Sequence, residues 1–248
     1  MVGSRLDNCF CGNSIIYKRN PRLNFKLLFY QTDYIYIFPV AVAVLGSATI
    51  DRFIGDSGVN IFEGLQGNDV FDGKGGSDTA ILSNPIADYT ITRSASGFVT
   101  FNTSGDDGRD TLLNIERLQF SDIGIAYDLD TSAGQVAKLI GAAFGRQQIQ
   151  NPKFVGIGLD LLDDSMTYDE LADLAIKVAG GSTPQQVVNV LWTNIVGSSP
   201  TAQQAQPFIN LLNNGLPTGE FVVLAAETNL NAANIDLVGL ANTGIEFI

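Results

Sequence analysis

Apolar residues follow two different periods along the chain, and the change of period divides it. From Gly46 to Ile81 the sequence consists of four nonapeptides, each with an apolar residue at position 8. From Thr131 onward the spacing is helical, so that Val136, Leu139 and Ile140 fall on one face. The pattern predicts turns and short strands in the first part and helices in the second.

The nonapeptides keep one register from beginning to end. Their shared residues are Gly46, Gly55, Gly64 and Gly73 at position 1; Gly58, Gly67 and Gly76 at position 4; Asp51, Asn60, Asp69 and Asp78 at position 6; and Phe53, Phe62, Phe71 and Ala80 at position 8. Glycine at two fixed places indicates a tight turn in each unit, followed by a short strand. The oxygen at position 6 can join backbone carbonyls in the all-oxygen shell that Ca²⁺ prefers. Position 8 is expected to point inward, so that stacked units bury a phenylalanine ladder.

These residues resemble the glycine-rich nonapeptide of RTX, or haemolysin-type, calcium-binding proteins. The resemblance implies a right-handed parallel β-roll in which two nonapeptides form one coil and each ion lies between turns two repeats apart. Asp51 would then pair with Asp69, and Asn60 with Asp78, with the glycine turns around them. This chain departs from the family because position 2 is never glycine, Thr49 replaces the first position-4 glycine, and Asn60 brings no charge. We therefore expect at most two calcium sites.

Alternation replaces the glycine period after the fourth repeat. Asp88–Arg93 and Gly97–Asn102 predict a hairpin around Ser94–Ser96. The run from Asp110 to Asp122 resembles the segment that closes RTX rolls, which implies that 46–130 form a calcium-binding β-roll together with its β cap. Asp106, Asp107 and Asp110 either hold another ion or form a solvated acidic loop.

The segment 131–248 predicts about six helices in two repeats of roughly fifty residues each. Thr167 with Glu170, and Thr183 with Gln186, form capping-box patterns. The segment resembles a helical domain of uncharacterised role at the C-terminus of RTX-type bacterial exoproteins. The fold class expected is therefore α+β and segregated: a short parallel β-roll with a β cap, followed by an all-α bundle. The last residues resemble an uncleaved export signal or form a terminal helix docked on the bundle.

Residues 1–45 differ from the rest and allow three interpretations. They form an atypical signal peptide, a poorly ordered or wrongly assigned start, or a capping strand of the roll. Cys9 and Cys11 are best interpreted as unpaired thiols.

Composition limits the function. The net charge is −12, so nucleic acid is not expected as a partner. The chain has no histidine, which removes the Ser-His-Asp triad and the H-E-x-x-H zinc site, and we expect no enzymatic activity. The family resemblance implies a secreted, extracellular protein that binds calcium ions and folds after type I export, with the type I secretion machinery as a partner. A surface adhesin or surface-layer protein that binds a cell-surface or protein partner through its helices, and the C-terminal remnant of a secreted hydrolase, remain as alternatives.

Overall fold

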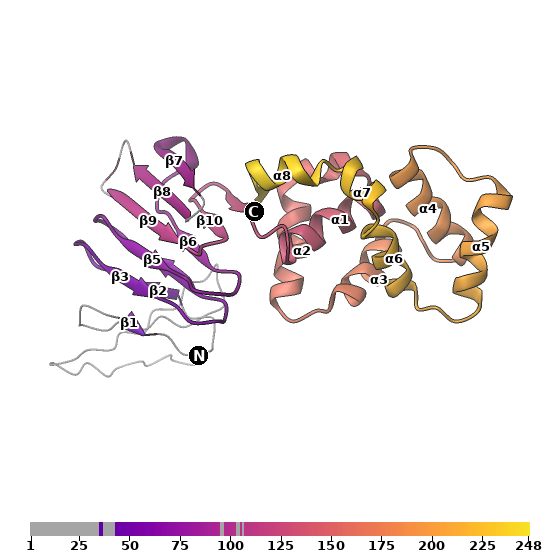
Figure 1. Ribbon diagram of the computed structural model, residues 1–248, viewed down its shortest axis with the longest axis horizontal. Helices are drawn as coiled ribbons and strands as arrows, with labels where there is room; N and C mark the ends of the chain where they lie inside the picture. Colours follow the sequence, from indigo (N-terminus) through magenta and orange to yellow (C-terminus); the bar gives the residue numbers. More distant parts are fainter. Residues whose placement is uncertain (1–34, 37–42, 95–96, 103–104, 106) are drawn as a thin grey trace, which may run out of the picture. The chain divides into compact units, whose positions relative to one another are not determined.

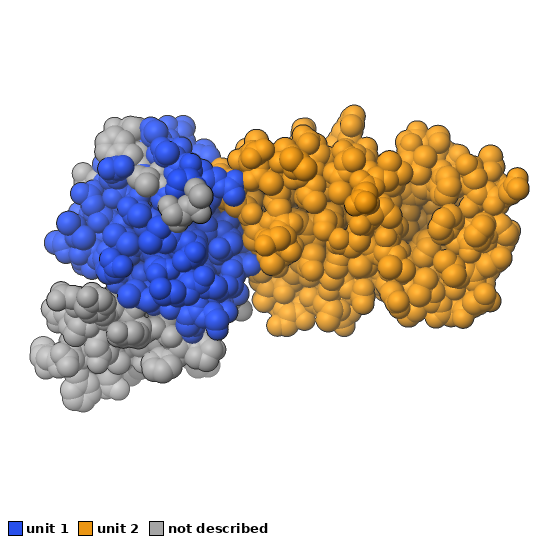
Figure 2. Space-filling model, in the orientation of Figure 1, with its two compact units in different colours: residues 1–123 blue, residues 124–248 orange. Residues whose placement is uncertain are grey.

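The structure is a computed structural model that describes residues 35–36, 43–94, 97–102, 105 and 107–248. The chain combines helices with two sheets and so belongs to the mixed α and β class. It divides into two compact units, Met1–Ile123 and Gly124–Ile248, which Figure 2 colours separately. The division falls before the expected boundary at residue 130, because Ala126 and Leu129 belong to the hydrophobic core of the second unit.

Unit 1 is built from short strands in two sheets. The strands are β1 (Ile35–Tyr36), β2 (Ala43–Leu45), β3 (Arg52–Ile54), β4 (Ile61–Glu63), β5 (Val70–Asp72), β6 (Thr79–Ile81), β7 (Tyr89–Ser94), β8 (Gly97–Asn102), β9 (Arg109–Leu113) and β10 (Arg117–Gln119), with a 3₁₀ turn η1 at Ile86–Asp88. One sheet has the order β1-β3-β5-β9-β8-β7 (Figure 1), and in unit 1 the other has the order β2-β4-β6-β10. Consecutive repeats therefore alternate between the sheets, and each strand pairs in parallel with the strand two repeats later.

The position-8 side chains form the core between the sheets. Phe53 pairs with Phe71 in the first sheet, and Phe62 pairs with Ala80 in the second. All four side chains are fully buried. The rings of Phe53 and Phe71 stack with centroids 4.8 Å apart, and Phe62 lies 5.6 Å from the first and 5.8 Å from the second. The predicted phenylalanine ladder is confirmed.

The third coil of unit 1 is interrupted by the predicted hairpin. β7 and β8 pair antiparallel, and β8 also pairs antiparallel with β9. After this detour β9 pairs in parallel with β5, which places Leu112 opposite Phe71, and β10 pairs in parallel with β6, which places Leu118 opposite Ala80. Both leucines are fully buried, so the segment 109–119 continues the stack of the nonapeptides.

Parts of residues 1–45 also join the stack. Val44 in β2 pairs with Phe62 and is buried, and Ile35 in β1 pairs with Phe53. Residues 43–45 therefore act as a strand at the open end of the repeats. Residues 1–34 and 37–42, including Cys9 and Cys11, lie outside the described residues.

Unit 2 is mainly helical. Its elements are β11 (Gly124–Ala126), α1 (Ser132–Phe144), a 3₁₀ helix η2 (Arg146–Gln150), α2 (Pro152–Asp163), α3 (Tyr168–Val178), α4 (Pro184–Val196), α5 (Ala202–Asn213), α6 (Thr218–Ala226), α7 (Asn229–Asn234), α8 (Leu237–Thr243) and β12 (Ile245–Phe247), visible in part in Figure 1. The bounds of α1 recur in α4 at an offset of 52, and those of α2 recur in α5 at an offset of 50. Both predicted capping boxes are present, and Thr201 with Gln204 forms a third.

The C-terminal residues form a helix and then a strand. β12 pairs antiparallel with β11, and the Ile248 N–H donates to the Pro152 carbonyl oxygen over 3.2 Å. A strand at this place was not predicted, because its partner lies more than a hundred residues earlier in the chain. No helix in the described part of the chain is long and apolar enough to span a bilayer.

Candidate metal centre

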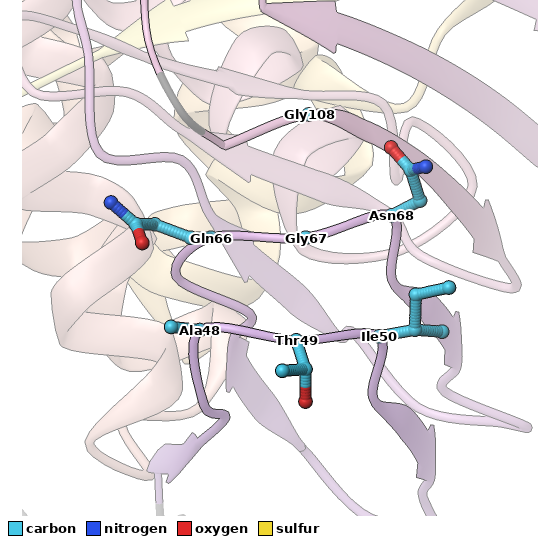
Figure 3. A pocket seen from close by; sticks show the side chains of 7 residues that line it. All are labelled: Ala48, Thr49, Ile50, Gln66, Gly67, Asn68 and Gly108. Carbon is cyan, nitrogen blue, oxygen red and sulfur yellow. The ribbon is translucent and has the colours of Figure 1, made fainter.

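The turns of unit 1 stack along two edges. One edge holds the turns of repeats one and three and the turn that ends at Asp110, and the other holds the turns of repeats two and four and the segment 114–116. Figure 3 shows the first edge, where Ala48–Ile50 run beside Gln66–Asn68 and Gly108 follows, around a shallow surface hollow. A Cβ at Gly67, whose φ is +137°, would lie 2.7 Å from the Thr49 carbonyl oxygen. Position 4 of repeat three is glycine because the backbone of repeat one leaves no room for a side chain there.

The position-6 residues form two ladders of hydrogen bonds, one along each edge. On the first edge the Asp51 N–H donates to Asp69 Oδ1 over 2.8 Å, and the Asp69 N–H donates to Asp110 Oδ1 over 2.9 Å. Each of these carboxylates thus accepts the backbone N–H of the position-6 residue in the preceding coil. Asp51 and Asp69, which the resemblance pairs around one ion, are joined by this hydrogen bond.

The second ladder repeats this arrangement. The Asn60 N–H donates to Asp78 Oδ1 over 2.6 Å, and the Asp78 N–H donates to Glu116 Oε2 over 2.8 Å. Sequence reasoning placed Asp110 in an acidic turn and missed Glu116. The available signal was an acid two places before a buried leucine, as in Asp110-Thr-Leu112 and Glu116-Arg-Leu118.

The four repeat turns are of two kinds. In Gly46–Asp51 and Gly55–Asn60, which we name the closed turns, the N–H at position 2 donates to the side chain at position 6. The Ser47 N–H donates to Asp51 Oδ2 over 2.6 Å, and the Asp56 N–H donates to Asn60 Oδ1 over 2.9 Å. A closed turn therefore satisfies its own position-6 oxygen.

The turns Gly64–Asp69 and Gly73–Asp78, which we name the open turns, differ at both places. Position 2 is left-handed in each, with a φ of +67° at Leu65 and +73° at Lys74. Oδ2 of Asp69 and Oδ2 of Asp78 are buried without a hydrogen-bond partner among the described residues. A non-glycine residue in this backbone region is strained, so leucine and lysine at position 2 have a conformational cost here.

Burial dominates the electrostatics of the open turns. The pKa of Asp69 is raised to about 7, mainly by burial and also by the charges of Asp110, Asp51 and Asp107, while the hydrogen bond from the Asp51 N–H lowers it. Burial likewise raises the pKa of Asp78 to about 7, helped by the negative charge of Glu116. A buried carboxylate without a counter-charge takes up either a proton or a cation.

The predicted glycines surround these oxygens. At Gly55, Gly64 and Gly73 a Cβ would lie 2.1, 2.1 and 2.3 Å from the position-6 oxygen of the same turn. The position-1 glycines therefore create the space that the side chain at position 6 fills. At Gly58 a Cβ would lie 3.2 Å from Asp56 Oδ1, whereas at Gly76 it would lie 2.3 Å from the Gly58 carbonyl oxygen.

The described residues contain no group of three or more His, Cys, Asp or Glu side chains that could hold a metal ion. An ion at an open turn would therefore need backbone carbonyls as well. Near Gly73, Asp78 Oδ2 and the Asn114 carbonyl oxygen each lie 2.3 Å from the place of the missing Cβ, so they are at most 4.6 Å apart (2.3 plus 2.3). Both are oxygen donors, which Ca²⁺ binds at about 2.3–2.6 Å, so the donor type fits calcium.

The side chains of the acidic turn before β9, which the sequence offers as another ion site, already have hydrogen-bond partners where the structure describes them. Oδ2 of Asp107 accepts hydrogen bonds from the Tyr89 hydroxyl and from the Ser83 N–H. Asp106 lies outside the described residues. Asp110 belongs to the first ladder instead of to a solvated loop, because it is buried and accepts the Asp69 N–H.

No protein-family model matches the chain, and no curated protein sequence matches it. Among solved structures it is similar to the crystal structure of the extracellular lipase LipA from Serratia marcescens, with 16% sequence identity and a TM-score of 0.20. The match covers 38% of this chain and 17% of the lipase chain. A likeness this low establishes neither a shared fold nor a shared activity.

Proposed function

We propose that unit 1 is a calcium-binding module of RTX-type nonapeptide repeats in a secreted bacterial protein. The observation that carries the proposal is the pair of buried carboxylate oxygens, Asp69 Oδ2 and Asp78 Oδ2, that have no partner in the described structure. Buried polar atoms in folded proteins almost always have a partner. A divalent cation is the partner that two negative ladders with carbonyl-rich turns suit best.

The proposal extends to the architecture and the cell biology. Unit 1 would be a short parallel β-roll closed by a β cap, and the helices after it an all-α bundle of two repeats. The parallel pairings at a spacing of eighteen residues support the roll, as in Arg52 with Val70 and Ile61 with Thr79. Type I export would deliver the chain to the extracellular space, where calcium is plentiful. The function proposed is binding, not catalysis.

Calcium would couple to folding through the charges of the ladders. When bound, the ion supplies the positive charge that the open turns lack. The protein holds the carboxylates in place through the N–H groups of Asp51 and Asn60, which orient Oδ1 of the next coil and leave Oδ2 available. Because the unfolded chain has no such arrangement, binding free energy becomes folding free energy.

A calcium titration of the full chain tests this proposal. The protein is first freed of metal, and far-ultraviolet circular dichroism is followed as calcium is added, with magnesium as the control. Extracellular calcium modules respond at about 10⁻⁴ to 10⁻³ M, so strand signal or thermal stability should rise in that range. An identical response to magnesium, or none to calcium, would refute the proposal.

A second candidate function, adhesion to a protein partner, has one supporting observation in unit 2. Leu174 on α3 and Leu224 on α6 occupy equivalent places in the two helical repeats, and their exposed fractions are 42% and 58%. Val178, one turn further along α3, is 68% exposed. Exposed apolar side chains that gather on packed helices are typical of interaction surfaces. Substitution of both leucines by serine should then reduce retention on the cell surface without changing the calcium response.

A further inference from the structure

The closed and open turns share one sequence template but differ in what their position-6 side chains still need. In the closed turns Asp51 Oδ2 accepts the Ser47 N–H and also the Ser47 hydroxyl, over 2.6 and 2.9 Å. Asn60 is an uncharged amide whose Oδ1 accepts the Asp56 N–H. Neither closed turn holds a buried position-6 oxygen without a partner, within the part of the chain that the structure describes.

The open turns need an additional ligand on their side chains. Asp69 and Asp78 are almost completely buried, and one carboxylate oxygen of each lacks a partner. The ion pair nearest in sequence does not relieve this, because Lys74 binds Asp72 over 2.5 Å. The charges that act on Asp69 all come from carboxylates.

The oxygen atoms that lie against each open turn on the side of the third coil come from the segment that follows the hairpin. Asp110 accepts the N–H of Asp69, and Glu116 accepts the N–H of Asp78. The Asn114 carbonyl oxygen faces the same space beside Gly73 as Asp78 Oδ2. Each open turn therefore has a carboxylate of the third coil next to it. The closed turns also lie against a carboxylate and a carbonyl oxygen of the next coil, so the buried Oδ2 without a partner is what distinguishes the open turns.

We propose that the two calcium ions bind at the open turns, between repeats three and four and the coil 107–119, and that the closed turns bind none. This inference rests on the proposed calcium function and changes the pairs that the sequence predicts. Asp69 would act with Asp110, and Asp78 with Glu116 and the Asn114 carbonyl. Repeats one and two would form a section of the roll that needs no metal, because their turns satisfy their own side chains.

The test is the number of calcium ions per full-length chain, measured by equilibrium dialysis at saturating calcium. The wild-type chain should bind two ions; Asp69→Asn and Asp78→Asn should each bind one, and the double variant none. Asp51→Asn should still bind two, because Asn60 shows that an amide fits a closed turn. Asn60→Asp should add a charge but no ion. Asp130→Asn, at an exposed residue of unit 2, controls for the loss of one negative charge.

The outcomes separate this inference from the proposed function. Loss of an ion in Asp51→Asn, a third ion in Asn60→Asp, or two ions in both Asp69→Asn and Asp78→Asn would overturn the assignment while leaving calcium binding intact. Absence of calcium from the wild-type chain would overturn both, and would mean that the buried carboxyls carry protons.

A second measurement uses the wild-type chain alone, so it does not depend on whether a variant folds. Amide hydrogen exchange is compared with and without calcium. Protection should increase at least tenfold in peptides that cover 64–82 and 107–119, and more than in peptides that cover 46–60. An equal increase in all three segments would refute the assignment.

Discussion

Replacement of Asp78 by asparagine should stabilise the metal-free protein and remove one of the two calcium sites, so that the response to calcium is reduced. Asp78 is fully buried, and burial raises its pKa from 3.8 to about 7. At about 1.4 kcal/mol for each pKa unit, the charged form costs the folded state at most about 4 kcal/mol. Asparagine has nearly the same shape, keeps an oxygen for the Asn60 N–H, and carries no charge.

The sign of the pH dependence follows from the proton balance. Because the folded pKa of Asp78 lies above the unfolded value, the folded state holds more protons between about pH 4 and pH 7. The contribution of Asp78 to the stability of metal-free unit 1 is therefore fully present at low pH, where this carboxyl is protonated in both states, and is lost as the pH rises through about 7. The variant should lose less stability over the same interval.

The assay is urea unfolding of metal-free protein at about pH 5, 6, 7 and 8, followed by far-ultraviolet circular dichroism. Fluorescence of Trp192, the single tryptophan, reports on unit 2 and provides an internal control. Asp78→Asn should exceed the wild type by up to about 4 kcal/mol at the highest pH and by about 1.6 kcal/mol near pH 5. A variant that is less stable than the wild type at about pH 8 without metal would refute this reasoning.

Three further predictions concern the turns and the core. Calcium at a hundred times its Kd should stabilise unit 1 by about 2.7 kcal/mol per site, measured as a rise in the urea midpoint. Asp69→Asn should lose the stabilisation of one site. The same stabilisation by calcium in this variant as in the wild type would contradict the role of the Asp69 carboxylate. Gly73→Ala should lower the free energy of unfolding by about 1–3 kcal/mol, because its Cβ would meet the Asn114 carbonyl oxygen at 2.3 Å. Gly75→Ala in the same turn, where the nearest atom lies 4.0 Å away, should leave the melting temperature nearly unchanged. Equal losses in the two variants would argue against the close stacking of the turns. Phe71→Ala removes a fully buried ring and should lower the free energy of unfolding by about 3–5 kcal/mol in urea. Leu174→Ala, at an exposed residue, should lower it much less. A small loss in Phe71→Ala would show that the phenylalanine ladder is not the core of unit 1.

The sequence predicted what depends on local periodicity. The inward position 8 follows from strict spacing, and Phe53, Phe62 and Phe71 are buried as expected. The hairpin follows from alternation on both sides of a short polar run, and β7 and β8 pair as predicted. The helix starts at Thr167 and Thr183 follow from capping chemistry that lies within four residues.

Long-range pairing and backbone state were not predictable in the same way. The hairpin separates Asp110 and Glu116 from the repeats, so no fixed period connects them to Asp69 and Asp78. The difference between closed and open turns depends on whether position 2 is left-handed, and Leu65 gives no sequence signal for that conformation. The strand β12 depends on a partner from the start of unit 2.

The hairpin within the third coil has a consequence for how this architecture can change. The chain leaves the stack after β6, runs through β7 and β8, and returns so that Leu112 lies opposite Phe71. The place of return is fixed by pairing and by the buried leucine, while the length of the excursion is free, because the entropy of closing a loop grows only slowly with its length. The third coil is therefore a natural acceptor site, where an inserted segment can be carried while the ladders on both sides stay in register.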